Sequence, residues 1–213
     1  MRSHYPTGSA WRRGLDSLRH ERPRTVAMKL LAELGYRRTV LLERPLDEPI
    51  PDGPKVEDVA FENIGADRVD EYLAYRPGSE RDAVTALLAE GAECHVLRHR
   101  GQIVSSCLAT ERPRPSRYTR MGVPMDHGDV YLTDAWTHPD HRGHSFAHVL
   151  CLCQLRHFRD RGYRRAIRLT VPENVSALRA HAKSGFRPVA IVGSLRVGPW
   201  QREFRRPWRG GPL

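Results

Sequence analysis

The feature that most constrains the fold is an apolar stretch that stops at a proline and continues through a glycine-containing turn into a helix. Residues 130–137 favour a strand that ends before Pro139. Residues 145–161 carry apolar side chains at helical spacing and stop at Gly162. A strand that leads directly into a helix presents several unpaired backbone N–H groups in one concavity, at the positive end of the helix dipole. The segment therefore predicts an anion-binding turn within an α/β chain.

The remaining periodicities predict a layered domain. From about residue 55 the expected order is β-α-α-β-β-β-α-β-α-β-β, with the last two strands at 186–193 and 195–204. Such an order is typical of a mixed sheet with helices on both faces, an α/β (α+β layered) fold.

The first part of the chain reads differently. Residues 1–22 are polar and basic, a helix is expected from Pro23, and a short strand covers 40–42. The proline-rich stretch 45–54 is interpreted as a linker. We therefore divide the chain into an arm with a helix-strand extension (1–54), a domain (55–205) and a basic tail (206–213).

The net charge of +10 favours an anionic partner. No recognised nucleic-acid motif occurs, and no apolar run approaches the roughly 18 residues of a membrane span, so we expect neither nucleic acid nor a membrane as partner. The N-terminus lacks a secretory signal, which predicts a cytoplasmic protein. A small anionic ligand needs only a few of these cations. The remaining positive charge is explained by solubility, by a second ligand or by self-association as a homodimer.

Metal chemistry finds little support in the sequence. The four cysteines form no CxxC pair. His144 and His148 are four apart on the expected helix, but they lack an obvious carboxylate or thiolate partner. We therefore expect no metal.

Two fragments resemble the GNAT superfamily of N-acetyltransferases. Residues 137–150 are similar to its acyl-CoA signature: Arg142 and Ala147 match, whereas Ser145 stands where the family usually has Gly. Residues 174–186 are similar to its later helix, which an Asn opens and a Gly-Phe pair ends. The resemblance covers about residues 55–205 and implies a GNAT-type mixed, mostly antiparallel sheet flanked by helices.

The resemblance also implies acetyl-CoA as co-substrate. If the turn requires positive φ at Ser145, serine is less favourable than glycine by about 1 kcal/mol; if the position is helical, serine is adequate. Residues expected to contact the cofactor, with a backbone N–H near the first two polarising the thioester carbonyl, are Trp136, Thr137, Arg142, Gly143, His144, Ser145, Phe146, Ala147, Asn174 and Ala177.

Catalytic roles follow from the same resemblance. His181 occupies the position of a family tyrosine that protonates the departing thiolate; the alternative is a surface helix residue. Asp134 is the single acid of its strand, and it is either a base for the amine or a structural acid. Strand alternation is expected to place it on one face with Trp136.

The resemblance also implies that the helix at about 66–75 borders the acceptor site. Three residues at this helix are therefore candidate substrate contacts, although helix packing explains them equally: Tyr72, Tyr75 and Arg76.

The sequence thus predicts an acyl-CoA-dependent N-acyltransferase, an N-acetyltransferase above all, acting by direct attack of an amine on the thioester. Two alternatives stay open: a catalytically silent fold that binds acyl-CoA, and a basic nucleic-acid-binding protein. The second rests on the net charge, on arginines in residues 1–22, and on cations interleaved with aromatic residues in the stretch 200–209.

Overall fold

The fold is that of a computed structural model, which describes residues 23–76, 78–112, 115–116 and 118–211. The predicted basic arm, residues 1–22, lies outside this range. The elements in chain order are α2 (Pro23–Glu33), β1 (Tyr36–Pro45), β2 (Val59–Ile64), η1 (Ala66–Arg68), α3 (Val69–Tyr75), α4 (Arg81–Ala89), β3 (Glu93–His99), β4 (Gln102–Thr110), β5 (Asp129–Thr137), η2 (Pro139–His141), α5 (Phe146–Asp160), β6 (Arg165–Thr170), α6 (Val175–Lys183), β7 (Arg187–Val197) and β8 (Trp200–Pro207).

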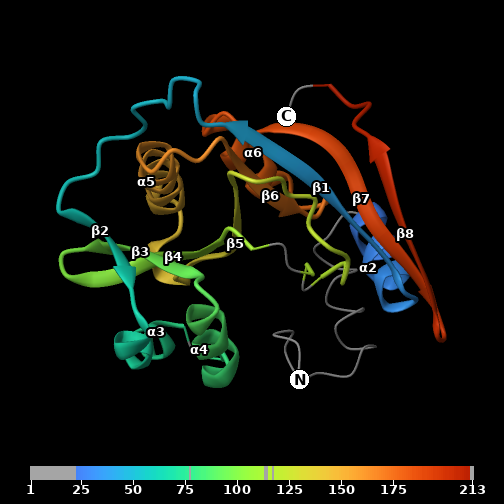
Figure 1. The fold of residues 1–213 in the computed structure, drawn as a ribbon, viewed down its shortest axis with the longest axis horizontal. Helices are drawn as coiled ribbons and strands as arrows, with labels where there is room; N and C mark the ends of the chain where they lie inside the picture. Colours follow the sequence, from blue (N-terminus) through green and yellow to red (C-terminus); the bar gives the residue numbers. More distant parts are fainter. Residues whose placement is uncertain (1–22, 77, 113–114, 117, 212–213) are drawn as a thin grey trace.

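All strands join one sheet in the order β2-β3-β4-β5-β6-β1-β7-β8. Neighbouring strands are antiparallel except β5 and β6, which are parallel because helix α5 makes the crossover between them. Helix α5 lies on one side of the β3–β5 region, whereas α3 and α4 lie on the other (Figure 1). The predicted mixed, mostly antiparallel sheet flanked by helices is thereby confirmed.

The parallel pair opens into a fork. Strands β5 and β6 are paired from Asp129↔Arg165 to Tyr131↔Ile167 only. Beyond that rung β5 continues to Thr137 and β6 to Thr170 without pairing to each other. The two strand ends therefore leave a gap in the hydrogen-bond ladder, directly before the turn that leads into α5.

The core has a layer on each side of this region. Under α5, side chains such as Leu150, Leu155 and Phe158 pack on β4 and β5, which explains the helical spacing of these apolar residues. On the opposite side, α3 and α4 pack Tyr72 and Val84 against β3 and β4. The fork lies between two well-packed layers, so its edges are held in place from both sides.

The predicted extension contributes a strand to the middle of the sheet. Strand β1 lies between β6 and β7 and pairs with both. Its run Val40, Leu41 and Leu42 is fully buried, because apolar side chains on both faces contact core. The boundary between residues 54 and 55 remains a prediction, but β1 and the later strands share one sheet.

The last hairpin differs from expectation. A break was expected near Ser194, yet β7 runs through it and the turn falls at Gly198, whose φ is +60°. Gly193 lies inside β7. A side chain is not tolerated at this position, because a Cβ there would lie 2.3 Å from the Arg37 carbonyl oxygen. The glycine therefore marks close approach between strands and not a turn. Within the described part of the chain, no helix combines the length and apolar character that crossing a bilayer requires.

Candidate active site

The turn between β5 and α5 leaves a row of backbone donors open. The N–H groups of residues 143–147 have no hydrogen-bond acceptor among the described residues. Gly143 has φ of +85° and Ser145 has φ of +62°, so the chain curls through left-handed conformations and aims these groups together. Ser145 thus occupies the conformation in which serine is less favourable than glycine. Open donors at a helix N-terminus form a binding site for an anion.

Around this turn the Arg142 and His144 side chains are exposed, whereas Phe146 is buried in the core under α5. Arg142 Nε donates to the Thr137 carbonyl oxygen at 3.3 Å, and His144 Nδ1 lies 3.0 Å from the Arg142 carbonyl oxygen. The His144 ring stacks on Phe146 at 5.8 Å between centroids. Arg142 and His144 therefore flank the open donors without occupying them.

One edge of the fork offers a further donor. The N–H of His138 donates to Val104 O on β4 at 3.2 Å. Because alternate N–H groups of a strand point to opposite edges, the Thr137 N–H faces the fork. The Trp136 carbonyl, on the β4 side, accepts from Ser105 Oγ at 3.2 Å. Of the two predicted donors, the geometry favours Thr137.

A bulge corrects the expected alternation along β5. Leu108 is opposite Thr133 and Ser106 is opposite Trp136, so two β5 residues stand against one residue of β4. Asp134 has φ of +56° in this bulge. Since Leu108 and Ser106 share a face, Thr133 and Trp136 share it too, whereas strand alternation is expected to group Trp136 with Asp134.

Asp134 is held by a two-armed ion pair. Arg76 Nη1 and Nη2 donate to Oδ2 and Oδ1 of Asp134, each at 2.7 Å. The exposed fractions are 11% for the Arg76 side chain and 25% for Asp134. Burial acts to lower the pKa of Arg76, but the hydrogen bonds and charge of Asp134 raise it overall. The pair fixes the C-terminal end of α3 to the bulge, the structural alternative for this acid.

The three candidate contacts on α3 differ in accessibility. Tyr72 has only 1% of its surface exposed and accepts from Arg76 Nη1 at 3.0 Å, so it serves packing and does not face a ligand. Tyr75 donates from its hydroxyl to the Trp136 carbonyl at 3.3 Å, and its ring meets the Trp136 edge. Arg76 is engaged with Asp134. Of the three side chains, Tyr72 is thus buried, whereas Tyr75 and Arg76 are partly exposed.

Helix α6 has the predicted ends. Asn174 Oδ1 accepts from the Ala177 N–H at 3.1 Å, which confirms the N-cap. Gly185 has φ of +83°, and the Phe186 N–H donates to His181 O at 3.1 Å, a Schellman arrangement. Ala177 thus lies in the capped first turn of α6.

The state of His181 differs from the one an acid requires. Burial, and secondly the charge of Arg168, lower the pKa of His181 to about 3. Its ring packs 5.8 Å from the Phe186 ring. The imidazole is therefore neutral near pH 7: it can donate one hydrogen bond, but it carries no imidazolium proton for a leaving group.

Arg168 was missed by the sequence analysis. It follows Ile167, the last β6 residue paired with β5, and only 5% of its surface is exposed. Its Nη2 lies 3.4 Å from Gln154 Oε1 and 3.8 Å from Cys107 Sγ, and its guanidinium covers the Phe186 ring. Its Nε has no hydrogen-bond partner among the described residues. The available signal was an arginine inside an apolar strand pattern.

A cavity of about 480 Å³ adjoins the bulge on the α4 side of β4 and β5. Leu108 and Tyr131 form apolar wall, and Glu90, Arg112 and Asp134 contribute charged groups. It thus approaches the end of the fork from the side opposite α5, which leaves room for a second reactant.

Comparisons with known proteins identify a family for the chain. The profile of the family described as "Acetyltransferase (GNAT) family" matches residues 56–186. No curated protein matches the sequence.

Three similar solved structures share the fold. A GCN5-related N-acetyltransferase from Sphaerobacter thermophilus is 19% identical with a TM-score of 0.55, covering 88% of this chain and 57% of its own. A GCN5-related glucosamine N-acetyltransferase region of a fungal multi-domain GH3 β-N-acetylglucosaminidase is 14% identical with a TM-score of 0.57, and the match covers 87% of this chain and 23% of that protein. A GCN5-related N-acetyltransferase from Kribbella flavida is 16% identical with a TM-score of 0.51, and the match covers 86% of this chain and 64% of that protein. The chain spans less than two thirds of the length of each.

Proposed function

Since the chain belongs to the GNAT acetyltransferase family, we propose that it transfers the acetyl group of acetyl-CoA to the amine of a small-molecule acceptor. The observation that carries this proposal is the run of open N–H groups at residues 143–147. These donors, with the helix dipole behind them, suit a diphosphate. Small side chains at Gly143, Ser145 and Ala147 allow it to approach.

The fork supplies the rest of the cofactor site. Acetyl-CoA, when bound, provides a thioester whose carbonyl carbon the amine attacks. The Thr137 N–H is aimed into the fork and would hydrogen-bond the oxygen on which negative charge develops. An acceptor in the cavity beside Asp134 would reach the same carbon from the α4 side, so the two reactants are oriented toward each other.

The leaving thiolate would be stabilised by charge. We assign this task to Arg168, whose guanidinium stays positive at every physiological pH and lies beside His181 and Phe186. His181, being neutral, would donate a hydrogen bond to the sulfur, and water would supply the proton. His181 as the acid itself remains a prediction, which its neutral state does not favour.

Asp134 would position the reactants. Because Arg76 engages both of its oxygens, the carboxylate holds the bulge in place and the proton of the amine passes to water. The role of Asp134 as the base remains the alternative, and it requires the ion pair to open.

Binding and turnover are tested separately. Acetyl-CoA at about 100-fold above its dissociation constant should raise the melting temperature by about 5 to 10 °C. Ala147→Glu places a carboxylate among the open donors and should abolish the shift, whereas Ala27→Glu, the same change on exposed α2, should retain it. No shift in the unchanged protein would contradict the proposal.

Thiol release across a panel of amines then distinguishes an enzyme from a silent module. Release that depends on the amine supports the enzyme. Acetyl-CoA binding without release for any amine would favour the acyl-CoA-binding module, with which Ser145 and the neutral His181 are compatible.

Location in the cytoplasm is part of the proposal, supported by the free thiols of Cys94, Cys107, Cys151 and Cys153.

A further inference from the structure

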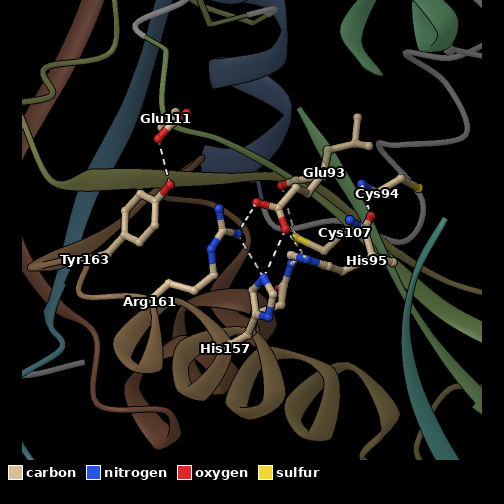
Figure 2. A network of polar contacts seen from close by, with 11 residues as sticks. Glu93, Cys94, His95, Cys107, Glu111, His157, Arg161 and Tyr163 are labelled. Atoms are coloured by element: carbon tan, nitrogen blue, oxygen red, sulfur yellow. Dashed lines mark hydrogen bonds and ion pairs between the residues drawn. The ribbon is translucent and has the colours of Figure 1, made fainter. Parts of the chain in front are cut away.

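A second cluster of functional side chains lies at the opposite end of α5. Glu93 and His95 come from β3, two residues apart and therefore on one face of the sheet. His157 lies in the last turn of α5, and Arg161 is the residue that caps its C-terminal end. Figure 2 shows the side chains of His157 and Arg161 converging on the Glu93 carboxylate. His157 is eleven residues beyond Phe146, about 16 Å along the helix, so this cluster is separate from the anion-binding turn.

The ligating atoms of three residues are close enough to share one ion. Glu93 Oε2 lies 3.1 Å from His95 Nε2 and 3.0 Å from His157 Nε2. The ligand atoms of these three residues all lie within 4.8 Å of one another. Ligands around tetrahedral zinc are roughly 3.3 Å apart, given zinc bonds of about 2.0 to 2.2 Å. Small side-chain movements would therefore create the correct spacing.

The hydrogen bonds of His157 conflict without an ion. Its Nε2 lies 3.0 Å from Glu93 Oε2, which only accepts, and 3.1 Å from Arg161 Nη1, which only donates. One ring nitrogen cannot donate to the first and accept from the second at the same time. A metal ion in place of the Arg161 guanidinium would remove the conflict, because His157 Nε2 and the Glu93 carboxylate could each donate a lone pair to it.

Surrounding contacts provide the orientation that metal ligands need. His95 is fully buried, and its Nδ1 lies 3.1 Å from Gln154 Nε2. Ligation through Nε2 puts the ring proton of His95 on Nδ1, which requires the Gln154 amide to turn its oxygen toward His95 and to give up the 3.4 Å contact between Oε1 and Arg168 Nη2. The Glu93 and His157 side chains are 20% and 29% exposed, so an ion and one water can reach them. Arg161, 45% exposed, can swing into solvent.

We propose that Glu93, His95 and His157 form a site for a divalent transition-metal ion, with zinc as the expected ion, which Arg161 closes in its absence. Two imidazoles, one carboxylate and a water complete a tetrahedral set. The ion would tie β3 to the C-terminal end of α5. This differs from the sequence-based expectation of no metal, which considered the histidines at 138–148 and could not see that β3 and α5 meet here.

The test uses the full chain after chelator treatment and desalting. Zinc chloride should raise the melting temperature, and equilibrium dialysis should give one zinc per chain. Cobalt should bind with the intense visible absorption of a four-coordinate ion. Glu93→Gln and His157→Asn should each weaken zinc binding at least tenfold, and His144→Asn, the same change at an exposed histidine, should leave it unchanged.

Arg161→Met gives the sharpest outcome. Removing the cation that competes for Glu93 should tighten zinc binding by about tenfold or more, which a purely structural ion-pair network does not predict. Zinc that neither binds stoichiometrically nor depends on Glu93 and His157 would overturn the proposal. The acetyl-CoA shift is independent of this result, so either proposal can fail without the other.

Discussion

The two ends of helix α5 satisfy their polar groups in opposite ways. At the N-terminal end, the N–H groups of residues 143–147 are open and the Arg142 and His144 side chains beside them are exposed. At the C-terminal end, Glu93 accepts from His157 and Arg161, and basic side chains face the negative end of the helix dipole. At the first end, open backbone N–H groups can bind an anion. At the second end, the side chains satisfy one another through hydrogen bonds and ion pairs.

The two ends of α5 also differ in what holds their conformation. The N-terminal turn is fixed by backbone conformation at Gly143 and Ser145, whereas the C-terminal cluster depends on residues from β3. Substitutions that alter one kind of support should leave the other end intact.

The largest expected effect is on Asp134. Asp134→Asn removes one charge of a mostly buried pair and should lower the free energy of unfolding by about 3 kcal/mol, because Arg76 is left without its partner. Urea denaturation measures this. Asp70→Asn, which breaks the exposed pair with Arg81, is the control and should change stability by less than about 0.5 kcal/mol. Equal effects would show that the bulge does not depend on its ion pair.

Arg168→Met separates catalysis from stability. If the guanidinium stabilises the thiolate, kcat should fall about 10- to 100-fold while acetyl-CoA still raises the melting temperature. Stability should be unchanged or increased, since a buried charge without a carboxylate is replaced by apolar volume. A normal kcat in the variant would remove Arg168 from the mechanism.

His181 predicts a pH dependence of stability. Its folded pKa of about 3 is below the unfolded value of 6.5, so the unfolded chain binds the proton first as the pH falls. Stability should decrease by about 1.5 kcal/mol between pH 6.5 and pH 5 through this group. His181→Gln should lose that slope, as thermal unfolding at several pH values would show, whereas His127→Gln should retain it. An unchanged slope in His181→Gln would mean that the ring titrates normally.

The smallest effect concerns the turn itself. Ser145→Gly should increase the free energy of unfolding by about 1 kcal/mol, because φ of +62° is free of cost for glycine only. Ser176→Gly, in the first turn of α6, should instead decrease it by a few tenths to 1 kcal/mol. A loss of stability at Ser145 would show that its hydroxyl makes a contact that outweighs the backbone cost.

What the sequence alone determined is local. The helix periodicities, the cap at Asn174 and the end at Gly185 were predicted correctly, because their hydrogen bonds join residues a few positions apart. The turn before α5 was predicted for the same reason, since an N–H is open or closed according to the nearby φ and ψ angles.

The tertiary structure decided everything that depends on distant partners. Arg76 and Asp134 are 58 residues apart, and the bulge that brings them together reverses the expected faces of β5. The neutral state of His181 comes from burial and from Arg168, and the Glu93 cluster exists only because α5 crosses β3. Burial and long-range pairing set these charges and contacts, and neither can be read from residue spacing.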